Sequence, residues 1–134
     1  MSQPHTPGTE ALLGRFEVSQ RFFFDAAHTL QREIEAESSA RIHGHTYHAE
    51  VTLAGQPDPQ TGMVVDLGQV RAHIATLREQ LDHRLLDEVP GLGVPTLENL
   101  CRFIADGMAS YASMLSAVRV WRESTGDGCV LRLG

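Results

Sequence analysis

Residues 42–54 read IHGHTYHAEVTLA, and the pattern of this stretch decides the fold. Side chains on a β-strand point alternately to the two faces of the sheet. The alternation therefore predicts a strand with two unlike faces, one of them buried. One face carries His43, His45, Tyr47, Ala49, Val51 and Leu53, and the other carries Thr46, His48, Glu50 and Thr52.

Three further segments show strand-like alternation. Residues 15–25, RFEVSQRFFFD, place aromatic and apolar residues on one face and lead directly into His28. Residues 117–123, AVRVWRE, alternate in the same way, and residues 129–133, CVLRL, follow a Ser-Thr-Gly-Asp-Gly turn. The C-terminal part is thus predicted to close as a hairpin.

Two amphipathic helices are predicted between the second and third strands. Apolar residues at three- and four-residue steps mark residues 67–81 as the first helix. Thr96 is a suitable N-cap for the second, which is expected to end near residues 110–113. This segregated order predicts an α+β domain whose four-stranded antiparallel sheet carries both helices on one face.

The bulk composition indicates one globular domain. The chain has 134 residues and 42% hydrophobic content, enough to build its own core. Residues 1–14 are rich in Pro, Gly and polar residues without periodicity, so we expect a disordered or loosely attached tail before a single domain at residues 15–134.

Charge and cysteine content narrow the class of function. A net charge of −6 argues against binding to nucleic acid or to an anionic membrane, which would need a basic face. No apolar run is long enough to span a bilayer and the N-terminus lacks a secretory pattern, so we expect a cytoplasmic protein. Cys101 and Cys129 have no metal-binding spacing and are expected to be free thiols, with Cys101 buried and inert.

The His43-Gly44-His45 triplet is the most informative motif for chemistry. Residues two apart on a strand project from the same face, so both imidazoles come within reach of one metal ion. His28, at the end of the preceding strand, supplies a third nitrogen if the two strands are neighbours. Three histidines would leave a fourth position open, as in a catalytic zinc site. The alternative interpretation is that these histidines bind no metal and are either hydrogen-bonded within the fold or exposed to solvent.

Other polar residues allow two interpretations each. Asp82 and His83, at the end of the first helix, could transfer protons together or simply form a solvated helix end. Glu123 is either a surface charge at a strand end or a carboxylate aimed at a ligand. His48 and His73 are expected not to bind metal.

Six short motifs occur in one order along nearly the whole chain, from about Phe16 to Arg132. Together they resemble the 6-pyruvoyl-tetrahydropterin synthases and the related bacterial 6-carboxy-tetrahydropterin synthases of queuosine biosynthesis, the bacterial branch more closely. The motifs are FDAAH at 24–28, HGHTY at 43–47, DPQTGMVVDL at 58–67, LDHRLLD at 81–87, PTLEN at 95–99 and the segment that starts at Glu123.

The resemblance implies a fold and a site. The fold would be the tunnelling fold, which forms a β-barrel as a trimer or a hexamer of identical chains with active sites between subunits. The substrate would be a small pterin, 7,8-dihydroneopterin triphosphate, and the cofactor Zn²⁺, although imidazoles suit several divalent ions. Implied site residues are His28, His43 and His45 for zinc, Asp82 and His83 for proton transfer, and Glu123, Thr96 and Glu98 for the pterin.

The chain departs from the family pattern at one position. The family has a catalytic cysteine four residues before the HGH motif, where this chain has Ser39. A serine hydroxyl forms almost no anion near neutral pH and is a poor replacement as a base. Glu35 or Glu37 could serve instead in a paralogue that cleaves the side chain to 6-hydroxymethyl-dihydropterin. A non-catalytic oligomer that binds pterin and metal is a further alternative.

Overall fold

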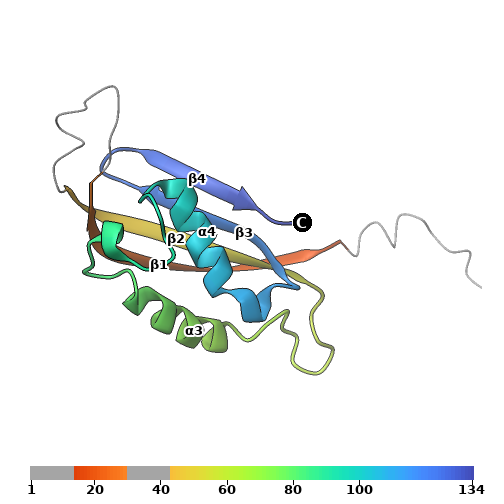
Figure 1. The fold of residues 1–134 in the computed structure, drawn as a ribbon. Coiled ribbons are helices and arrows are strands. Elements are labelled where there is room, and N and C mark those ends of the chain that lie inside the picture. Colours follow the sequence, from red (N-terminus) through yellow and green to blue (C-terminus); the bar gives the residue numbers. More distant parts are fainter. Residues whose placement is uncertain (1–13, 30–42) are drawn as a thin grey trace, which may run out of the picture.

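The computed structural model describes residues 14–29 and 43–134, without the side chain of His43. Its four strands form one antiparallel sheet in the order β1-β2-β3-β4, with two helices on one face (Figure 1). No helix in these two ranges is long and apolar enough to cross a membrane. The elements are β1 (Phe16–His28), β2 (His43–Gly55), α3 (Leu67–Glu79), η1 (Leu86–Glu88), α4 (Leu97–Gly107), η2 (Ala109–Tyr111), β3 (Leu115–Arg122) and β4 (Asp127–Arg132).

The predicted fold class is confirmed, and the element boundaries shift by a few residues. β1 continues to His28 because its pairing with β2 runs without interruption to the pair His28–His43. α4 ends at Gly107, earlier than predicted, and the short 3-10 helix η2 follows it. The predicted tail, apart from Gly14, lies outside the described residues.

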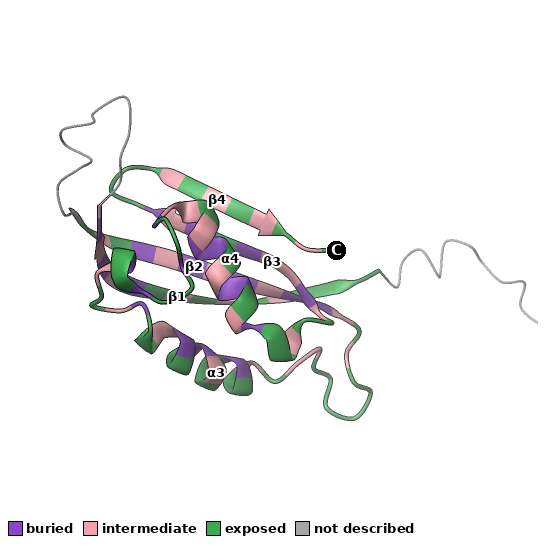
Figure 2. Cartoon of the chain, viewed as in Figure 1, coloured by how far each residue is buried: buried purple, intermediate pink, exposed green. Residues whose placement is uncertain are grey.

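The two faces of the sheet differ as the alternation of β2 predicts. Tyr47, Ala49, Val51 and Leu53 are all buried under the helices. Figure 2 shows the buried stripes of α3 and α4 turned toward this inner face. Side chains from α3, α4 and the strands form a single core, because each amphipathic element can bury its apolar side only against another.

The helix starts follow from local sequence. The Asp66 side chain accepts a hydrogen bond of 2.8 Å from the backbone N–H of Gly68 at the start of α3. The Thr96 hydroxyl oxygen accepts one of 3.1 Å from Asn99 N at the start of α4. These bonds satisfy N–H groups that a helix cannot pair internally. Thr96 is therefore the N-cap of α4, as the sequence predicted.

The segment after α3 covers the open edge of β1. His83 N donates to the Asp25 carbonyl at 2.6 Å, and Ala27 N donates to the Arg84 carbonyl at 3.0 Å. Leu85 forms an isolated parallel bridge with Ala27. His83 has a left-handed φ of 58°, which turns the chain from the helix toward the strand. The sheet edge beside His28 is thereby paired.

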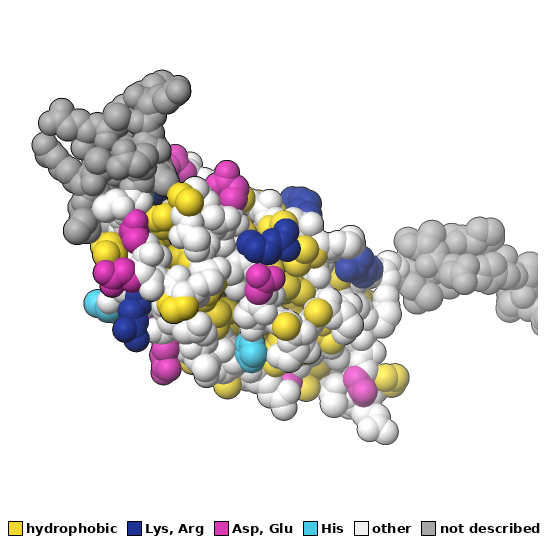
Figure 3. All heavy atoms as spheres, viewed as in Figure 1, with side chains coloured by type: hydrophobic (Ala, Val, Ile, Leu, Met, Phe, Trp, Pro, Cys, Tyr) yellow, Lys and Arg dark blue, Asp and Glu magenta, His cyan; other side chains and the backbone are white. Residues whose placement is uncertain are grey.

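Figure 3 shows the helix-bearing side of the molecule as a mixture of apolar, acidic and basic groups. Arginine supplies every basic side chain, since the sequence contains no lysine. Cations and anions are interspersed on this side, so it presents no continuous basic surface.

Val120 and Val130 test the assignment of the two sheet faces. Val120 of β3 is fully buried, whereas Val130 of β4 is 44% exposed on the opposite face. Val120→Ala removes buried methyl groups and should lower the free energy of unfolding by about 2 kcal/mol. Val130→Ala should lower the free energy of unfolding by less than half as much, as measured by urea unfolding. Equal losses in the two variants would contradict the assignment of the two faces.

Candidate active site

Two predicted metal ligands lie together at one end of the sheet. His28 is the last residue of β1 and is 3% exposed, and His45 is near the start of β2. Their rings stack with centroids 5.0 Å apart and an interplanar angle of 25°. In the strand register His28 pairs with His43 and Ala26 pairs with His45. Paired residues share a face, so all three histidine positions belong to the inner face.

This donor set fits a divalent metal such as zinc. Imidazole nitrogens are good zinc ligands, and three of them leave a position for substrate or water. No group of three potential metal ligands occurs within the described ranges, from which the His43 side chain is absent. The close pair of His28 and His45, with position 43 directly across from His28, is the observation that supports the fit.

Asp87 anchors the chain just beyond His28, a contact that sequence reasoning missed. The backbone N–H of Thr29 donates to Asp87 Oδ1 at 2.9 Å, and the Thr29 hydroxyl donates to Oδ2 at 2.6 Å. Burial alone would raise the pKa of Asp87, but the hydrogen bonds from Thr29 outweigh it and lower that pKa overall. The carboxylate fixes the end of β1 and with it the backbone of His28.

Asp82 and His83 form the predicted pair. His83 Nδ1 lies 2.9 Å from Asp82 Oδ2, while Asp82 Oδ1 accepts a 2.9 Å hydrogen bond from Asp25 N. Arg78 approaches the same carboxylate at 3.4 Å. The hydrogen bonds from the Asp25 backbone and from His83, with the Arg78 charge, outweigh burial and lower the pKa of Asp82. An ionised carboxylate therefore holds one nitrogen of an imidazole that is 79% exposed.

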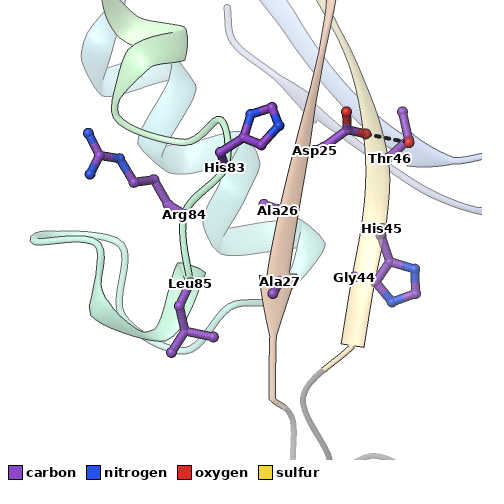
Figure 4. A pocket seen from close by; sticks show the side chains of 9 residues that line it. All are labelled: Asp25, Ala26, Ala27, Gly44, His45, Thr46, His83, Arg84 and Leu85. Atoms are coloured by element: carbon purple, nitrogen blue, oxygen red, sulfur yellow. Dashed lines mark hydrogen bonds between the residues drawn. The ribbon is translucent and has the colours of Figure 1, made fainter.

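His45 and His83 line the same open cavity, of about 520 Å³. Figure 4 shows the segment 83–85 running along β1 on the side opposite β2, which carries His45. Asp25 and Thr46 join the two strands across this surface through a hydrogen bond between their side chains. The cavity thus places the exposed imidazole of His83 on the rim of a surface that includes one metal-ligand candidate.

A second cavity, of about 180 Å³, contains both predicted pterin contacts on α4. Thr96 and Glu98 line it from the start of the helix, and Tyr47 and the ion pair of Arg122 with Asp127 line it from the sheet. The Tyr47 ring centroid is 5.8 Å from that of His45. The cavity therefore adjoins the histidine pair. The sequence did not indicate Arg122 or Asp127.

Glu123 lies beside this cavity and not in it. It follows β3 in the tight turn to β4 and is exposed. Its Oε1 accepts a 3.0 Å hydrogen bond from Trp121 Nε1, and it lines a neighbouring cavity of about 270 Å³. Arg122 and Asp127 line both cavities. Glu123 thus lines a different cavity from Thr96 and Glu98, and the two cavities share the ion pair of Arg122 with Asp127.

Other polar candidates have roles within the fold. His48 stacks on Trp121 at 5.5 Å between centroids, and His73 Nε2 lies 2.6 Å from the Gly107 carbonyl oxygen. Cys101 is buried, and burial raises the pKa of its thiol to about 12, so it is inert as predicted. The candidates for the missing base, Ser39 with Glu35 and Glu37, lie outside the described residues.

Comparison with solved structures defines the fold class. Caenorhabditis elegans 6-pyruvoyl tetrahydropterin synthase superposes with a TM-score of 0.77 at 24% identity, over 91% of this chain and 98% of that one. A catalytic-residue mutant of Plasmodium vivax 6-pyruvoyltetrahydropterin synthase, with glutamate replaced by alanine, gives a TM-score of 0.64 at 15% identity, over 90% and 99% of the two chains. The chain therefore has the tunnelling fold.

Sequence comparison then gives the family. The model described as 6-pyruvoyl tetrahydropterin synthase matches residues 17–133, and the chain belongs to this family. Human 6-pyruvoyl tetrahydrobiopterin synthase is 33% identical over 106 residues, 69% of this chain and 73% of that protein. Bacillus subtilis 6-carboxy-5,6,7,8-tetrahydropterin synthase is 29% identical over 128 residues, 87% and 85% of the two chains. The expected class, a tetrahydropterin synthase-type lyase, is confirmed at the level of the family.

Asp82→Asn tests the electrostatic role of the carboxylate. Because the pKa of Asp82 is lowered by folding, its contribution to stability is present above the ordinary carboxyl pKa and is lost as pH falls through the lowered value. We expect the variant to lose about 1 kcal/mol of unfolding free energy at neutral pH. In urea unfolding at neutral pH and in acid, the difference in unfolding free energy between native and variant protein should shrink as pH falls below the ordinary carboxyl value.

The matched control is Asp106→Asn, which changes an exposed carboxylate on α4. It should leave the unfolding free energy within about 0.5 kcal/mol of native at both pH values. A loss in Asp82→Asn that is the same in acid as at neutral pH would show that the ionised form contributes nothing.

Proposed function

We propose that the protein is a zinc-dependent lyase that converts 7,8-dihydroneopterin triphosphate to a 6-substituted pterin, as a 6-carboxy- or 6-pyruvoyl-tetrahydropterin synthase. The main observation in support is the stacked pair of His28 and His45, with position 43 across from His28 in the strand register. Family membership and the names of the human and Bacillus relatives support the reaction class.

His28, His43 and His45 would hold the metal at the end of the β1–β2 pair. Bound zinc supplies a Lewis acid that polarises the hydroxyl groups of the substrate side chain and so acidifies the adjacent C–H and O–H groups. The histidines themselves would hold the metal in position. Because His28 is buried and its strand end is fixed by Asp87, the ligands would need little rearrangement on binding.

Asp82 and His83 would transfer protons during the reaction. The Asp82 carboxylate favours the tautomer of His83 in which Nδ1 carries the proton and donates it to Oδ2. Nε2 is then the nitrogen that accepts a proton from substrate and later returns it, while triphosphate leaves. The exposure of the His83 side chain, 79%, agrees with a group that meets its substrate or a neighbouring subunit.

Thr96, Glu98 and Glu123 would bind the pterin ring. A carboxylate can accept hydrogen bonds from the N–H groups at the edge of a pterin. Glu98 lines the cavity next to Tyr47, and Glu123 lies across the Arg122–Asp127 pair from it. Tyr47, which lines the Glu98 cavity, has its ring centroid 5.8 Å from that of His45.

The expected context of the enzyme is part of the same proposal. We place it in the cytoplasm, as a trimer or hexamer of identical chains that acts on a small pterin, without nucleic acid or membrane as a partner. A role in queuosine biosynthesis is proposed because the DPQTG turn and the segment before PTLEN resemble the bacterial branch. The 29% identity to the Bacillus synthase over 87% of this chain supports that assignment.

A second candidate product follows from Ser39. Without the family cysteine, a glutamate such as Glu35 or Glu37 would act as base, and the side chain would be cleaved to 6-hydroxymethyl-dihydropterin. The catalytic glutamate of the Plasmodium vivax synthase shows that a family fold can carry such a residue. If no base is present, the protein would bind pterin and metal without turnover.

His45→Ala tests the metal site. Removing one of three imidazoles should reduce the zinc that remains after dialysis to less than about a tenth of native and abolish turnover. Elemental analysis measures the metal and chromatography the product. The control is His48→Ala on the outer face, which should keep its zinc. Full zinc content in His45→Ala would refute the ligand assignment.

The product identifies the branch. We expect zinc-loaded native protein incubated with 7,8-dihydroneopterin triphosphate to yield a 6-substituted pterin by mass spectrometry, and Ser39→Cys to raise the rate because a thiolate is the better base. Turnover by Ser39→Cys alone would show an intact scaffold that Ser39 has inactivated. No turnover by either protein would refute the lyase assignment.

A further inference from the structure

Arg78, in the last turn of α3, contacts two other parts of the fold. Its Nε donates to the carbonyl oxygen of Phe23 on β1 at 2.5 Å, and its guanidinium carbon lies 5.3 Å from the centroid of the Phe23 ring. Its Nη2 lies 3.4 Å from Asp82 Oδ2. A guanidinium can make both polar contacts at once because its N–H groups point in fixed directions. Arg78 thus holds a positive charge between β1 and the carboxylate that contacts His83.

Arg78 and His83 share one oxygen of the Asp82 carboxylate. Oδ2 lies 2.9 Å from His83 Nδ1 and 3.4 Å from Arg78 Nη2, while Oδ1 accepts the backbone N–H of Asp25. The hydrogen bonds from Asp25 N and from His83, together with the Arg78 charge, lower the pKa of Asp82. The carboxylate is therefore an anion with a cation beside the oxygen that faces the imidazole.

This cation limits how strongly Asp82 stabilises a positive charge on His83. A proton-transfer group must accept a proton and later release it, so neither of its two forms can be strongly favoured. The Asp82 carboxylate by itself would favour a positively charged imidazole. A second positive charge on the same carboxylate oxygen opposes this by Coulomb repulsion. With Arg78 in place, the imidazole faces an ion pair instead of an uncompensated anion.

The other charged groups near His83 do not replace Arg78. The titratable and charged groups around His83 are Asp82 and Arg84 beside it in the chain, Asp25 on β1, His45 on β2 and Arg78 on α3. Figure 4 shows the Arg84 side chain pointing away from the His83 ring, and its Nε donates to the Glu79 carbonyl at 3.4 Å. Asp25 adds a second carboxylate to the cavity. Within the described residues, Arg78 is the arginine that offsets Asp82.

We propose that Arg78 is a positioning residue for proton transfer, whose guanidinium shares Asp82 Oδ2 with His83 and offsets the carboxylate charge, so that His83 can release the proton it accepts. This inference rests on the proposed function, because that function assigns proton transfer to Asp82 and His83. Arg78 itself does not contact the substrate. Its hydrogen bond to the Phe23 carbonyl keeps the charge in place throughout the reaction.

Arg78→Gln and Arg78→Lys separate the charge from the rest of the side chain. Glutamine is neutral but can still donate to the Phe23 carbonyl, whereas lysine keeps the positive charge. All three residues have similar helix propensities, so α3 itself should be unaffected. The measurement is steady-state turnover of 7,8-dihydroneopterin triphosphate by zinc-loaded protein, carried out in Ser39→Cys protein if native protein does not turn over.

Arg78→Gln should lower kcat about tenfold and leave KM within about twofold of native, because Arg78 acts on proton transfer and not on substrate binding. Arg78→Lys should restore kcat to within about threefold of native, because it returns the charge to Asp82. A residue that only supports the fold would not give this rescue by charge.

The matched control is Arg71→Gln on the same helix. Arg71 lies two turns before Arg78 on the same face of α3, and its Nη1 donates to the uncharged Gln20 side chain of β1 at 3.2 Å. This variant should keep native kcat and KM. The urea unfolding midpoint and the zinc content of every variant should equal those of native protein, which excludes effects through the fold and the metal.

The outcomes distinguish this inference from the proposed function. No turnover by native or Ser39→Cys protein would overturn both. Turnover with the same kcat in Arg78→Gln and Arg71→Gln would overturn the inference alone. A loss of kcat in Arg78→Gln that Arg78→Lys shares in full would also overturn it, since the charge would then play no part. A raised KM with unchanged kcat would overturn it too, since Arg78 would then bind the substrate.

Discussion

The register between β1 and β2 is the constraint on which the rest of the structure depends. All thirteen residues of β1 pair with β2 without a shift, from Phe16–Gly55 to His28–His43. A slip by one residue would turn every side chain of the strand to the opposite face. The apolar residues of both inner faces prevent that slip because they must meet the helices. The same apolar alternation therefore brings the positions of His28 and His45 onto one face.

Two carboxylates hold the outer edge of β1, which the segment after α3 covers. Asp82 accepts the backbone N–H of Asp25, and Asp87 accepts that of Thr29, one on each side of His28. Both have a lowered pKa because hydrogen bonds to the charged form outweigh burial. The LDHRLLD motif thus supplies the strand edge with two anions, and one of these also orients the His83 imidazole. The same segment therefore supports the edge of β1 and carries the residues proposed to transfer protons.

The site consists of two adjoining parts with different chemistry. Around His28 and His45 the donors are imidazoles suited to a metal. Beyond Tyr47 the groups are a hydroxyl, carboxylates and a buried guanidinium, which suit the edge of a heterocycle. The proposed substrate has a flat ring and a polar side chain, one for each of these two parts. The family is named for a product with both features, a tetrahydropterin that carries a side chain at position 6.

The sequence by itself determined the fold class, the order of elements, the inner face of β2 and the histidine triplet, because these depend on local periodicity and on short spacings. The six ordered motifs also identified the family. The tertiary structure decided what distant segments do to one another. Asp87 meets Thr29 and Arg122 meets Tyr47 only after the chain folds, and burial, not residue type, distinguishes Arg122 from the exposed Arg119. Hydrogen bonding and desolvation depend on these long-range contacts, which no local pattern records.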